Sequence, residues 1–343
     1  MFLKLASLNL FALAVIGSLL PGMARAQESD RNIMASMEGG SQTLIARDIA
    51  ELGNKCGLPL HVVDSHGSLE NFFGVRNRHN TQFGIVDSDI LNYLSAYRGS
   101  NDDVKQAIQG MRIMLPLYDA EVHVVARAGI NSLQDLRGKR LGVGQKDGTA
   151  YLTSQLILDI LRIQVAERVA GSADEMIELL RQGEIDALLK VGNAPMPMFT
   201  DGRLDNSFHM VPITDDVLHA SYKPVTLAAG TYSFQREPIK TIASKTLLMT
   251  YEYGSEKNAY YRNSCKAVAD FTNLIVGNLD ELRRVGHHPK WKTLNLTEIP
   301  KGWEVGSCVR KGLEPTYEVS CTEQVDSADN QQYLDLLRNR LRQ

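Results

Sequence analysis

The chain has 343 residues, of which 43% are hydrophobic and 22% are charged, and its formal net charge is −3. This length is enough for two domains of ordinary size. A mildly acidic chain without a run of basic residues is poorly suited to binding nucleic acid or an anionic lipid surface, because both need clustered Lys and Arg.

Residues 1–26 have the pattern of a signal peptide. Lys4 precedes an apolar stretch from Leu5 to Leu20, and Ala24-Arg25-Ala26 places small residues at the two positions that a signal peptidase reads. The stretch is shorter than the roughly 20 apolar residues of a membrane span. We therefore expect cleavage before Gln27 and export of a soluble protein to the periplasm.

The remaining chain alternates short apolar runs with amphipathic segments. Runs bounded by Gly, Asp or Pro predict strands at Leu60–Val63, Phe83–Val86, Ile113–Leu117, Val122–Ala126, Arg140–Val143, Ala187–Val191 and Thr246–Tyr251. Apolar residues at helical spacing predict helices at Thr43–Leu52, Tyr151–Leu161 and Asn258–Val276. Ser172-Ala173-Asp174-Glu175 is the capping box of a further helix that ends at Gly183. This alternation indicates an α/β fold with parallel βαβ units.

Four loops share one construction, in which an apolar run is followed by small polar residues and then by a helix. They are Glu38-Gly39-Gly40-Ser41, Ser65–Asn71, Val86-Asp87-Ser88-Asp89 and Gly142–Thr149. Glycine lets a ligand approach the backbone, and a helix N-terminus offers unpaired N–H groups and a partial positive charge. Each loop alone is typical of a turn and a helix cap. Together they predict a site for an anion such as a carboxylate.

Four cysteines lie after the predicted cleavage site: Cys56, Cys265, Cys308 and Cys321. An even number in an exported protein indicates disulfides, and four cysteines permit three pairings. Cys308 and Cys321 stand close together in a tail that contains Gly and Pro, so we expect these two to be linked. The state of Cys56 and Cys265 is left open.

The segments resemble, in their order and in their residues, the solute receptors of tripartite ATP-independent periplasmic (TRAP) transporters, specifically the TAXI group. Matching segments include Glu38-Gly39-Gly40, Gly67–Asn71, Gly84-Ile85-Val86 with Ser88-Asp89, Leu117-Tyr118, Gly148-Thr149, Gly183–Ala187, Gly192 with Pro195, and Ala229-Gly230-Thr231-Tyr232. Two departures bear on charge. Asp87 stands where the family often has Gln, and Lys146-Asp147 precede Gly148-Thr149.

The resemblance implies a two-lobed, type II-like periplasmic binding protein with its ligand cleft between the lobes. Lobe 1 would combine 27–122 with 232–343, and lobe 2 would be 123–231, with crossings near Val122–Val125 and Ala229–Tyr232. It also implies a small carboxylate of the glutamate or 2-oxoglutarate type, or an amino acid, as ligand and a TRAP-type permease as partner. The cleft residues carried over are Gly40, Ser41, Ser68, Asn71, Ser88, Tyr118, Gly148, Thr149, Pro195 and Tyr232. We expect a monomer without cofactor, metal or nucleic acid.

An exported enzyme is the main rival class. The sequence contains no Gly-x-Ser-x-Gly, His-Glu-x-x-His or Cys-x-x-Cys motif. His287-His288 are adjacent, so on a helix they would point about 100° apart and could not share a metal ion; we expect a surface turn before Pro289. An exported sensor without transport needs the same cleft as a receptor and remains an alternative. An exported hydrolase is less favoured, although a folded catalytic triad follows no sequence order.

Overall fold

The structure is a computed structural model that describes residues 31–36, 40–284, 286–319 and 321. The signal peptide expected at 1–26 lies outside these residues. Within the described ranges, no helix has the length and apolar character needed to cross a membrane.

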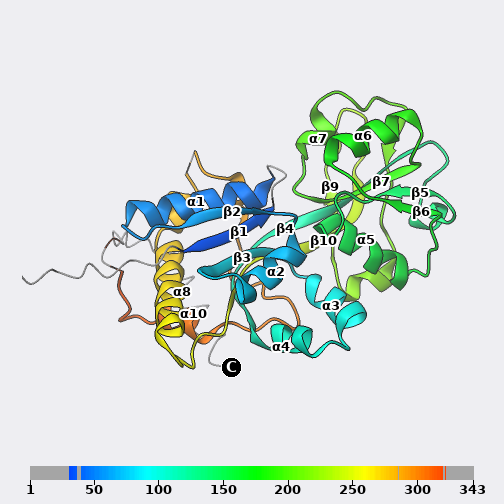
Figure 1. Cartoon of the computed structure of the whole chain (residues 1–343). Helices are drawn as coiled ribbons and strands as arrows, with labels where there is room; N and C mark the ends of the chain where they lie inside the picture. The colour runs from blue at the N-terminus through cyan, green and yellow to red at the C-terminus, as the bar shows by residue number, and fades with distance from the viewer. Residues whose placement is uncertain (1–30, 37–39, 285, 320, 322–343) are drawn as a thin grey trace, which may run out of the picture.

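The described elements form two lobes, and one mixed sheet of ten strands passes through both (Figure 1). The strand order is β2-β1-β3-β10-β4-β7-β5-β6, with β8 beside β4 and β9 beside β10. The α/β, two-lobed fold class expected from the sequence is therefore confirmed. Lobe 1 contains the strands β1 (Asn32–Ser36), β2 (His61–Ser65) and β3 (Thr81–Asp87), and lobe 2 contains β5 (Arg140–Gly142), β6 (Glu167–Val169), β7 (Ala187–Gly192), β8 (Phe208–Met210) and β9 (Lys223–Leu227).

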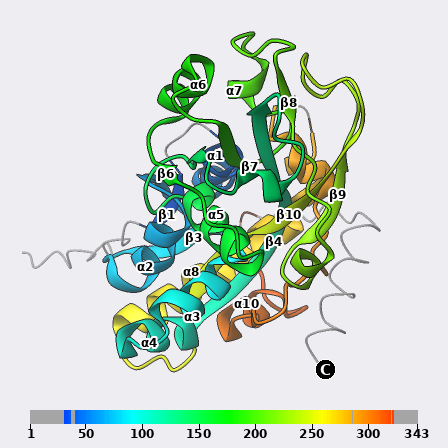
Figure 2. The ribbon, with the colours of Figure 1, turned by 90° about the vertical axis from the view of Figure 1, so that its right-hand side faces the viewer.

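Two long antiparallel strands, β4 (Met111–Arg127) and β10 (Ile239–Tyr251), connect the lobes. Figure 2 shows both running from one lobe into the other. The two strands expected at Ile113–Leu117 and Val122–Ala126 are thus one strand. The register shifts beside Pro116, where a residue without an N–H cannot donate to its neighbour.

The second passage between the lobes lies later than expected. The first residues of β10 pair with β9 of lobe 2, and its residues Thr246–Met249 pair with β3 of lobe 1. Tyr232, expected at the crossing, is instead buried in a hydrophobic core of lobe 2 together with Phe234. The division at 27–122 plus 232–343 and 123–231 otherwise stays a prediction.

Helices cover both faces of the sheet, and 3-10 turns complete the connections. Lobe 1 contains α1 (Ser41–Lys55), α2 (Ser68–Asn77), α3 (Ile90–Arg98), α4 (Asp102–Gly110), α8 (Ala259–Gly277), α9 (Leu279–Leu282), η3 (Pro289–Thr293) and α10 (Ser307–Gly312). Lobe 2 contains η1 (Leu133–Leu136), α5 (Thr149–Ile160), α6 (Ala173–Gln182), α7 (Pro197–Thr200) and η2 (Asp216–Ala220). The predicted capping box at Ser172 is confirmed, and α6 ends at Gly183 in the left-handed conformation, φ 77°.

The cores follow from the alternation of side chains along the strands. In lobe 2, Val124 and Leu189 face one hydrophobic cluster with Ile157 of α5, whereas Val125 and Leu188 face another with Ile177 of α6. Successive strand residues point to opposite faces, so a strand covered by helices on both sides is apolar at every position. Lobe 1 has one larger core, which includes Phe72, Phe83 and Phe271.

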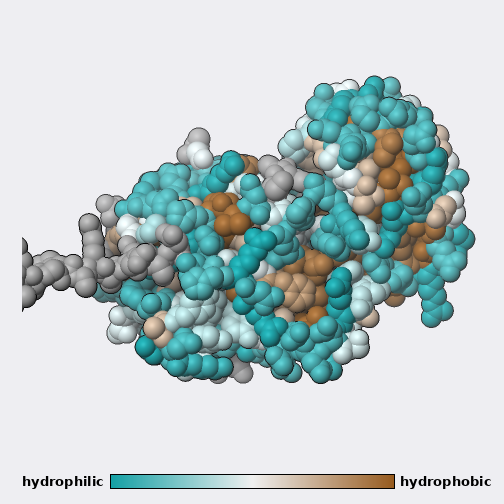
Figure 3. Space-filling view, viewed as in Figure 1, coloured by the Kyte–Doolittle hydropathy of each residue, from teal (hydrophilic) through white to brown (hydrophobic). Residues whose placement is uncertain are grey.

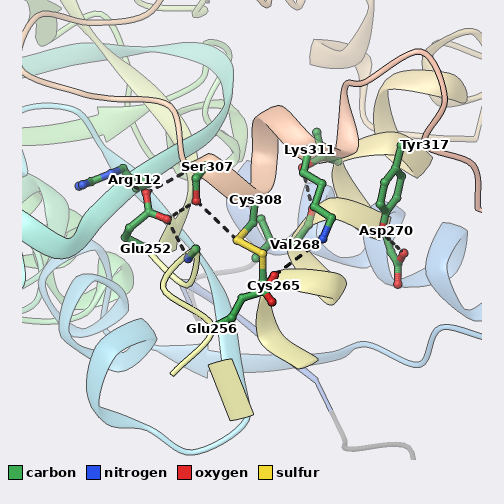
Figure 4. The surroundings of a disulfide bond; sticks show 12 residues. Arg112, Glu252, Glu256, Cys265, Val268, Asp270, Ser307, Cys308, Lys311 and Tyr317 are labelled. Carbon is green, nitrogen blue, oxygen red and sulfur yellow. Dashed lines mark hydrogen bonds and ion pairs between the residues drawn. A yellow bond between two sulfur atoms is a disulfide. The ribbon is translucent and has the colours of Figure 1, made fainter. Parts of the chain in front are cut away.

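The cysteine pairing expected from sequence is wrong. Cys308 bonds Cys265, and Cys321 bonds Cys56, with Cα–Cα distances of 5.2 and 4.9 Å. The reason is tertiary packing, because α10 lies against α8 and brings Cys308 onto that helix (Figure 4). Ser307, the neighbour of Cys308, donates a hydrogen bond to Glu252, which also accepts from Arg112.

Candidate functional site

A cavity of about 410 Å³ lies between the two lobes. Its volume falls in the range of small-molecule sites. The walls come from the start of α1, the middle of β4, the loop before α5, the segment from β7 into α7, and the start of η3. Six of the ten predicted cleft residues line it: Gly40, Ser41, Tyr118, Gly148, Thr149 and Pro195.

Two helix N-termini meet this cavity, one from each lobe. The N-cap residues are Gly40 for α1 and Gly148 for α5, and neither helix has a side-chain cap. The first N–H groups of a helix lack partners within the helix, and its dipole places a partial positive charge there. Both ends can therefore hold an anion through backbone groups alone.

Lys190 places a basic side chain in the same region. Its side chain on β7 lines the cavity and is buried. A Cβ atom placed on Gly144 would lie 3.2 Å from the Lys190 Nζ, so the ammonium group is beside the loop that leads into α5. The sequence analysis missed Lys190. The signal that could have found it is a single lysine inside the apolar strand Ala187–Gly192.

Asp87 is a fully buried carboxyl group at the end of β3 that also lines the cavity. Thr246 Oγ1 donates to its Oδ1 at 2.6 Å, and Ser68 Oγ and Gln42 Nε2 donate to its Oδ2 at 3.3 and 3.4 Å. Burial, and secondly the charge of Asp89, raise the pKa of Asp87 to about 6. Near neutral pH this group therefore changes between an acceptor and a donor.

Hydrogen bonds join the lobes around the cavity. Ser68 Oγ and Thr149 Oγ1 are 3.1 Å apart, and Asn193 Nδ2 donates to Ser41 Oγ at 2.6 Å. Behind them, Asp89 Oδ2 accepts from two hydroxyls of lobe 2, those of Thr153 at 2.7 Å and Tyr222 at 3.0 Å. The structure is therefore a closed arrangement of the lobes.

The other four predicted residues do not line the cavity and lie directly behind it. Ser68 donates to Asp87, and Asn71 Nδ2 donates to the Ile85 carbonyl at 2.7 Å, which attaches α2 to β3. Ser88 Oγ accepts from the Lys245 N–H at 3.2 Å and lies 3.2 Å from Ser244 Oγ.

Tyr232 fixes the cavity wall that contains Met196. Its hydroxyl accepts from the Met196 N–H at 3.1 Å and lies 2.8 Å from His123 Nε2. Burial lowers the pKa of His123 to about 4, so this imidazole is neutral. Its Nδ1 faces the Glu121 carbonyl at 2.9 Å and must carry the hydrogen, which makes Nε2 the acceptor of the Tyr232 proton.

The segment His287–Lys290 is a part of the site that the sequence analysis placed in a surface turn. His288, Pro289 and Lys290 line the cavity. Asp48 of α1 holds the segment, because its Oδ2 accepts from the His288 N–H at 2.8 Å and from Trp291 Nε1 at 2.7 Å. A contact between residues 240 or more positions apart leaves no mark in a local sequence pattern.

The charges near this wall are paired or reduced. Lys290 Nζ lies 3.4 Å from Glu121 Oε1. Burial lowers the pKa of His288. In the described residues, no group of three or more His, Cys, Asp or Glu side chains has an arrangement that could hold a metal ion.

Comparison with known proteins gives one family and many distant structures. The model of the NMT1-like family matches residues 37–301. Similar solved structures include Tv2483 bound to L-arginine (13% identity, TM-score 0.46, covering 78% of this chain and 93% of that one). The periplasmic binding protein BugD is also similar (11% identity, TM-score 0.43, covering 72% of this chain and 85% of that one). So is an ancestral arginine-binding protein bound to arginine (12% identity, TM-score 0.44, covering 77% of this chain and 95% of that one).

The family match covers most of the chain and spans both lobes and the cavity between them. The two disulfides agree with an oxidising compartment outside the cytoplasm. The chain belongs to the NMT1-like family.

Proposed function

We propose that the protein is an extracytoplasmic receptor that binds a small carboxylate or an amino acid in the cavity between its lobes and delivers it to a TRAP-type membrane permease. The observation that carries the proposal is the meeting of two glycine-capped helix N-termini, one from each lobe, beside the Lys190 ammonium group. Three sources of positive potential at one small cavity favour an anion.

The ligand carboxylate is assigned to the α5 end of the cavity. Thr149 opens this helix and lines the cavity, and Lys190 lies beside the preceding loop. Asp87 is the acidic group of the same cavity. When ionised, it would accept a hydrogen bond from the ammonium group of an amino acid; when protonated, it would donate one to a ligand oxygen.

The ten residues carried over from the resemblance divide into two proposed groups. Gly40, Ser41, Tyr118, Gly148, Thr149 and Pro195 would contact the ligand, because they line the cavity. The other four, Ser68, Asn71, Ser88 and Tyr232, would support the site through hydrogen bonds to Asp87, Ile85, Ser244 and Met196, respectively.

Binding would work through closure of the lobes. A ligand that contacts α1 in lobe 1 and α5 in lobe 2 has its full set of contacts only when the lobes are closed. A ligand shifts such an equilibrium by its differential affinity for the two states and by nothing else. The closed form is then the one that a permease would distinguish from the empty receptor.

A calorimetric titration with small carboxylates and amino acids tests the site. Thr149→Ala removes one hydrogen bond to a charged group, which typically costs about 1.5–3 kcal/mol and corresponds to a tenfold to hundredfold weaker Kd. Lys190→Met should weaken binding at least as much. Thr226→Val, an exposed threonine of β9 outside the cavity, is the matched control and should bind like the wild type.

Two outcomes would contradict the proposal. One is a Thr149→Ala variant with wild-type affinity for every carboxylate that binds. The other is a methyl ester that binds as tightly as its parent acid, since the ester keeps the shape and loses the charge. Transport and sensing are separated by reconstitution, because only a transport receptor gives ligand uptake with a permease in vesicles.

A further inference from the structure

One wall of the cavity is apolar and includes a leucine that the fold leaves exposed. Leu44 lines the cavity from the first turn of α1 and is 42% exposed. Among the described residues, only one other large hydrophobic side chain is classed as exposed, Val217 at 57%. Val217 belongs to η2 and does not line the cavity. In Figure 3 most of the visible face is hydrophilic, with separate hydrophobic patches on both lobes.

The opposite lobe presents further apolar groups to the same space. Met196 lines the cavity from the end of the connection between β7 and α7, and Pro197 and Met198 line it from the start of α7. Met196 follows Asn193 by three residues, and Asn193 donates to Ser41, which precedes Leu44 by three. Leu44 and this connection therefore lie near the same interlobe hydrogen bond. Methionine side chains are unbranched and adapt to irregular apolar surfaces.

The charges at this wall disfavour a second ligand carboxylate. Glu121 Oε2 accepts from the Ala194 N–H at 3.0 Å, which places a carboxylate directly against the segment that leads to Met196. Lys290, one of the two lysines that line the cavity, already pairs with Glu121. A ligand anion here would face the negative charge of Glu121 and an ammonium group that is partly neutralised. An apolar group would meet neither penalty.

We infer that the ligand is a monocarboxylate, or an amino acid, whose other end is an aliphatic or aromatic group that packs between Leu44 of lobe 1 and Met196, Pro197 and Met198 of lobe 2. This inference rests on the proposed function for the carboxylate end of the ligand. It differs from the expectation of a glutamate-type ligand, which would have a second carboxylate at the other end. Because the apolar group would touch both lobes, its burial would stabilise the closed state.

The test compares ligands of equal length that differ at the far end. The pairs are hexanoate with adipate, and norleucine with 2-aminoadipate, titrated into the whole exported chain by calorimetry. Hexanoate or norleucine should bind at least tenfold more tightly than its partner. From butanoate to hexanoate, each added methylene should tighten binding about fourfold, the effect of burying one CH₂ group.

Variants locate the effect at this wall. Leu44→Ser should weaken the binding of the better monocarboxylate about tenfold. The affinity for acetate, which has no long apolar end, should stay the same. Val217→Ser removes the exposed apolar side chain that lies outside the cavity, and it should leave the affinity for these ligands unchanged. Met196→Gln keeps the length of the side chain and should reduce the preference for the monocarboxylate. Leu44 and Val217 are both exposed, so their substitution should not prevent folding.

The possible failures are distinct. The inference of an apolar ligand end would be wrong if adipate or 2-aminoadipate bound as tightly as its partner. It would also be wrong if Leu44→Ser and Val217→Ser had the same affinity. Neither result would contradict the proposed carboxylate receptor. Methyl hexanoate binding as tightly as hexanoate would overturn the proposed function, because the charged end would then contribute nothing. A lack of binding by every compound would overturn both.

Discussion

Asp87 shows how the fold changes the chemistry of a single residue. Its carboxyl accepts hydrogen bonds from several donors and feels the charge of Asp89, and the residue is 1% exposed. Burial therefore favours its protonated form in the folded protein, and the pKa of Asp87 rises from 3.8 to about 6. The unfolded chain ionises near 3.8 and the folded chain near 6, so the folded state binds more protons between these values.

This difference predicts a pH-dependent effect of Asp87→Asn on stability. As pH rises from about 4 to about 6, wild type loses stability at this site because the unfolded carboxyl ionises first. The variant has no such loss. The free energy of unfolding of Asp87→Asn relative to wild type should rise by about 3 kcal/mol across this window and stay constant above it. Urea denaturation at several pH values measures this, and a flat difference would contradict it.

Lys190 and Asp48 are two residues of the site that the sequence analysis missed, for different reasons. The glycine-rich starts of α1 and α5 are local patterns, and six of the ten residues named from them and from the resemblance line the cavity. Lys190 enters from the interior of a strand. Asp48 acts through the distant segment His287–Trp291. The role of Asp48 depends on contacts between elements, which a pattern of one short segment does not encode, whereas a lone lysine in an apolar strand is a local signal.

At the scale of elements, a local pattern predicted α6 correctly. Contacts between distant segments explain why the predictions for β4 and for the disulfide pairing were wrong. The capping box at Ser172 is complete within four residues, so the start of α6 needs no information from elsewhere. The sequence predicted strands at Ile113–Leu117 and Val122–Ala126, but pairing with β10 continues across the residues between them and makes them one strand. Cys308 and Cys321 are close in sequence, yet the packing of α10 on α8 selects Cys265 as the partner of Cys308.

The Cys265–Cys308 bond should stabilise this pair of helices measurably. It closes a sequence separation of 43 residues. The chain-entropy model gives about 4 kcal/mol for such a loop, and measured values for disulfides are typically about 2–4 kcal/mol. Cys265→Ser combined with Cys308→Ser should lower the free energy of unfolding by an amount in this range.

Two measurements check that expectation. Guanidinium denaturation of the double variant gives the loss of stability, and Ser307→Ala, beside Cys308, serves as a control that keeps the disulfide. Peptide mapping of the oxidised wild type without reductant should recover Cys265 linked to Cys308 and Cys56 linked to Cys321. A Cys308–Cys321 peptide would contradict the packing of α10 on α8.

At the scale of the whole molecule, the balance between open and closed lobes rests partly on Asp89. This buried carboxyl in lobe 1 accepts from Thr153 and Tyr222 in lobe 2, so the two bonds exist only when the lobes are closed. In an open form, water would solvate Asp89 instead. Loss of both donors removes interactions of the closed state alone, which shifts the equilibrium toward opening.

Thr153→Val combined with Tyr222→Phe should therefore enlarge the ligand-free protein. Small-angle X-ray scattering should give a larger radius of gyration than for wild type, and ligand affinity should fall in proportion to the closed fraction. The control is again Thr226→Val, which removes an exposed hydroxyl of β9. An unchanged radius with unchanged affinity would mean that these bonds do not control closure.

The Cys56–Cys321 bond has a mechanical consequence. It joins positions separated by 265 residues, and all of lobe 2 lies between them. Tension applied to the two ends of the oxidised chain would pass through the sulfur–sulfur bond and leave lobe 2 unloaded. With both disulfides reduced, unfolding under tension could extend the enclosed segment to at most about 900 Å, at roughly 3.4 Å per residue. Lobe 2 is therefore shielded from pulling forces while the bond is intact, and the receptor can be stretched at its ends without losing that wall of its cavity.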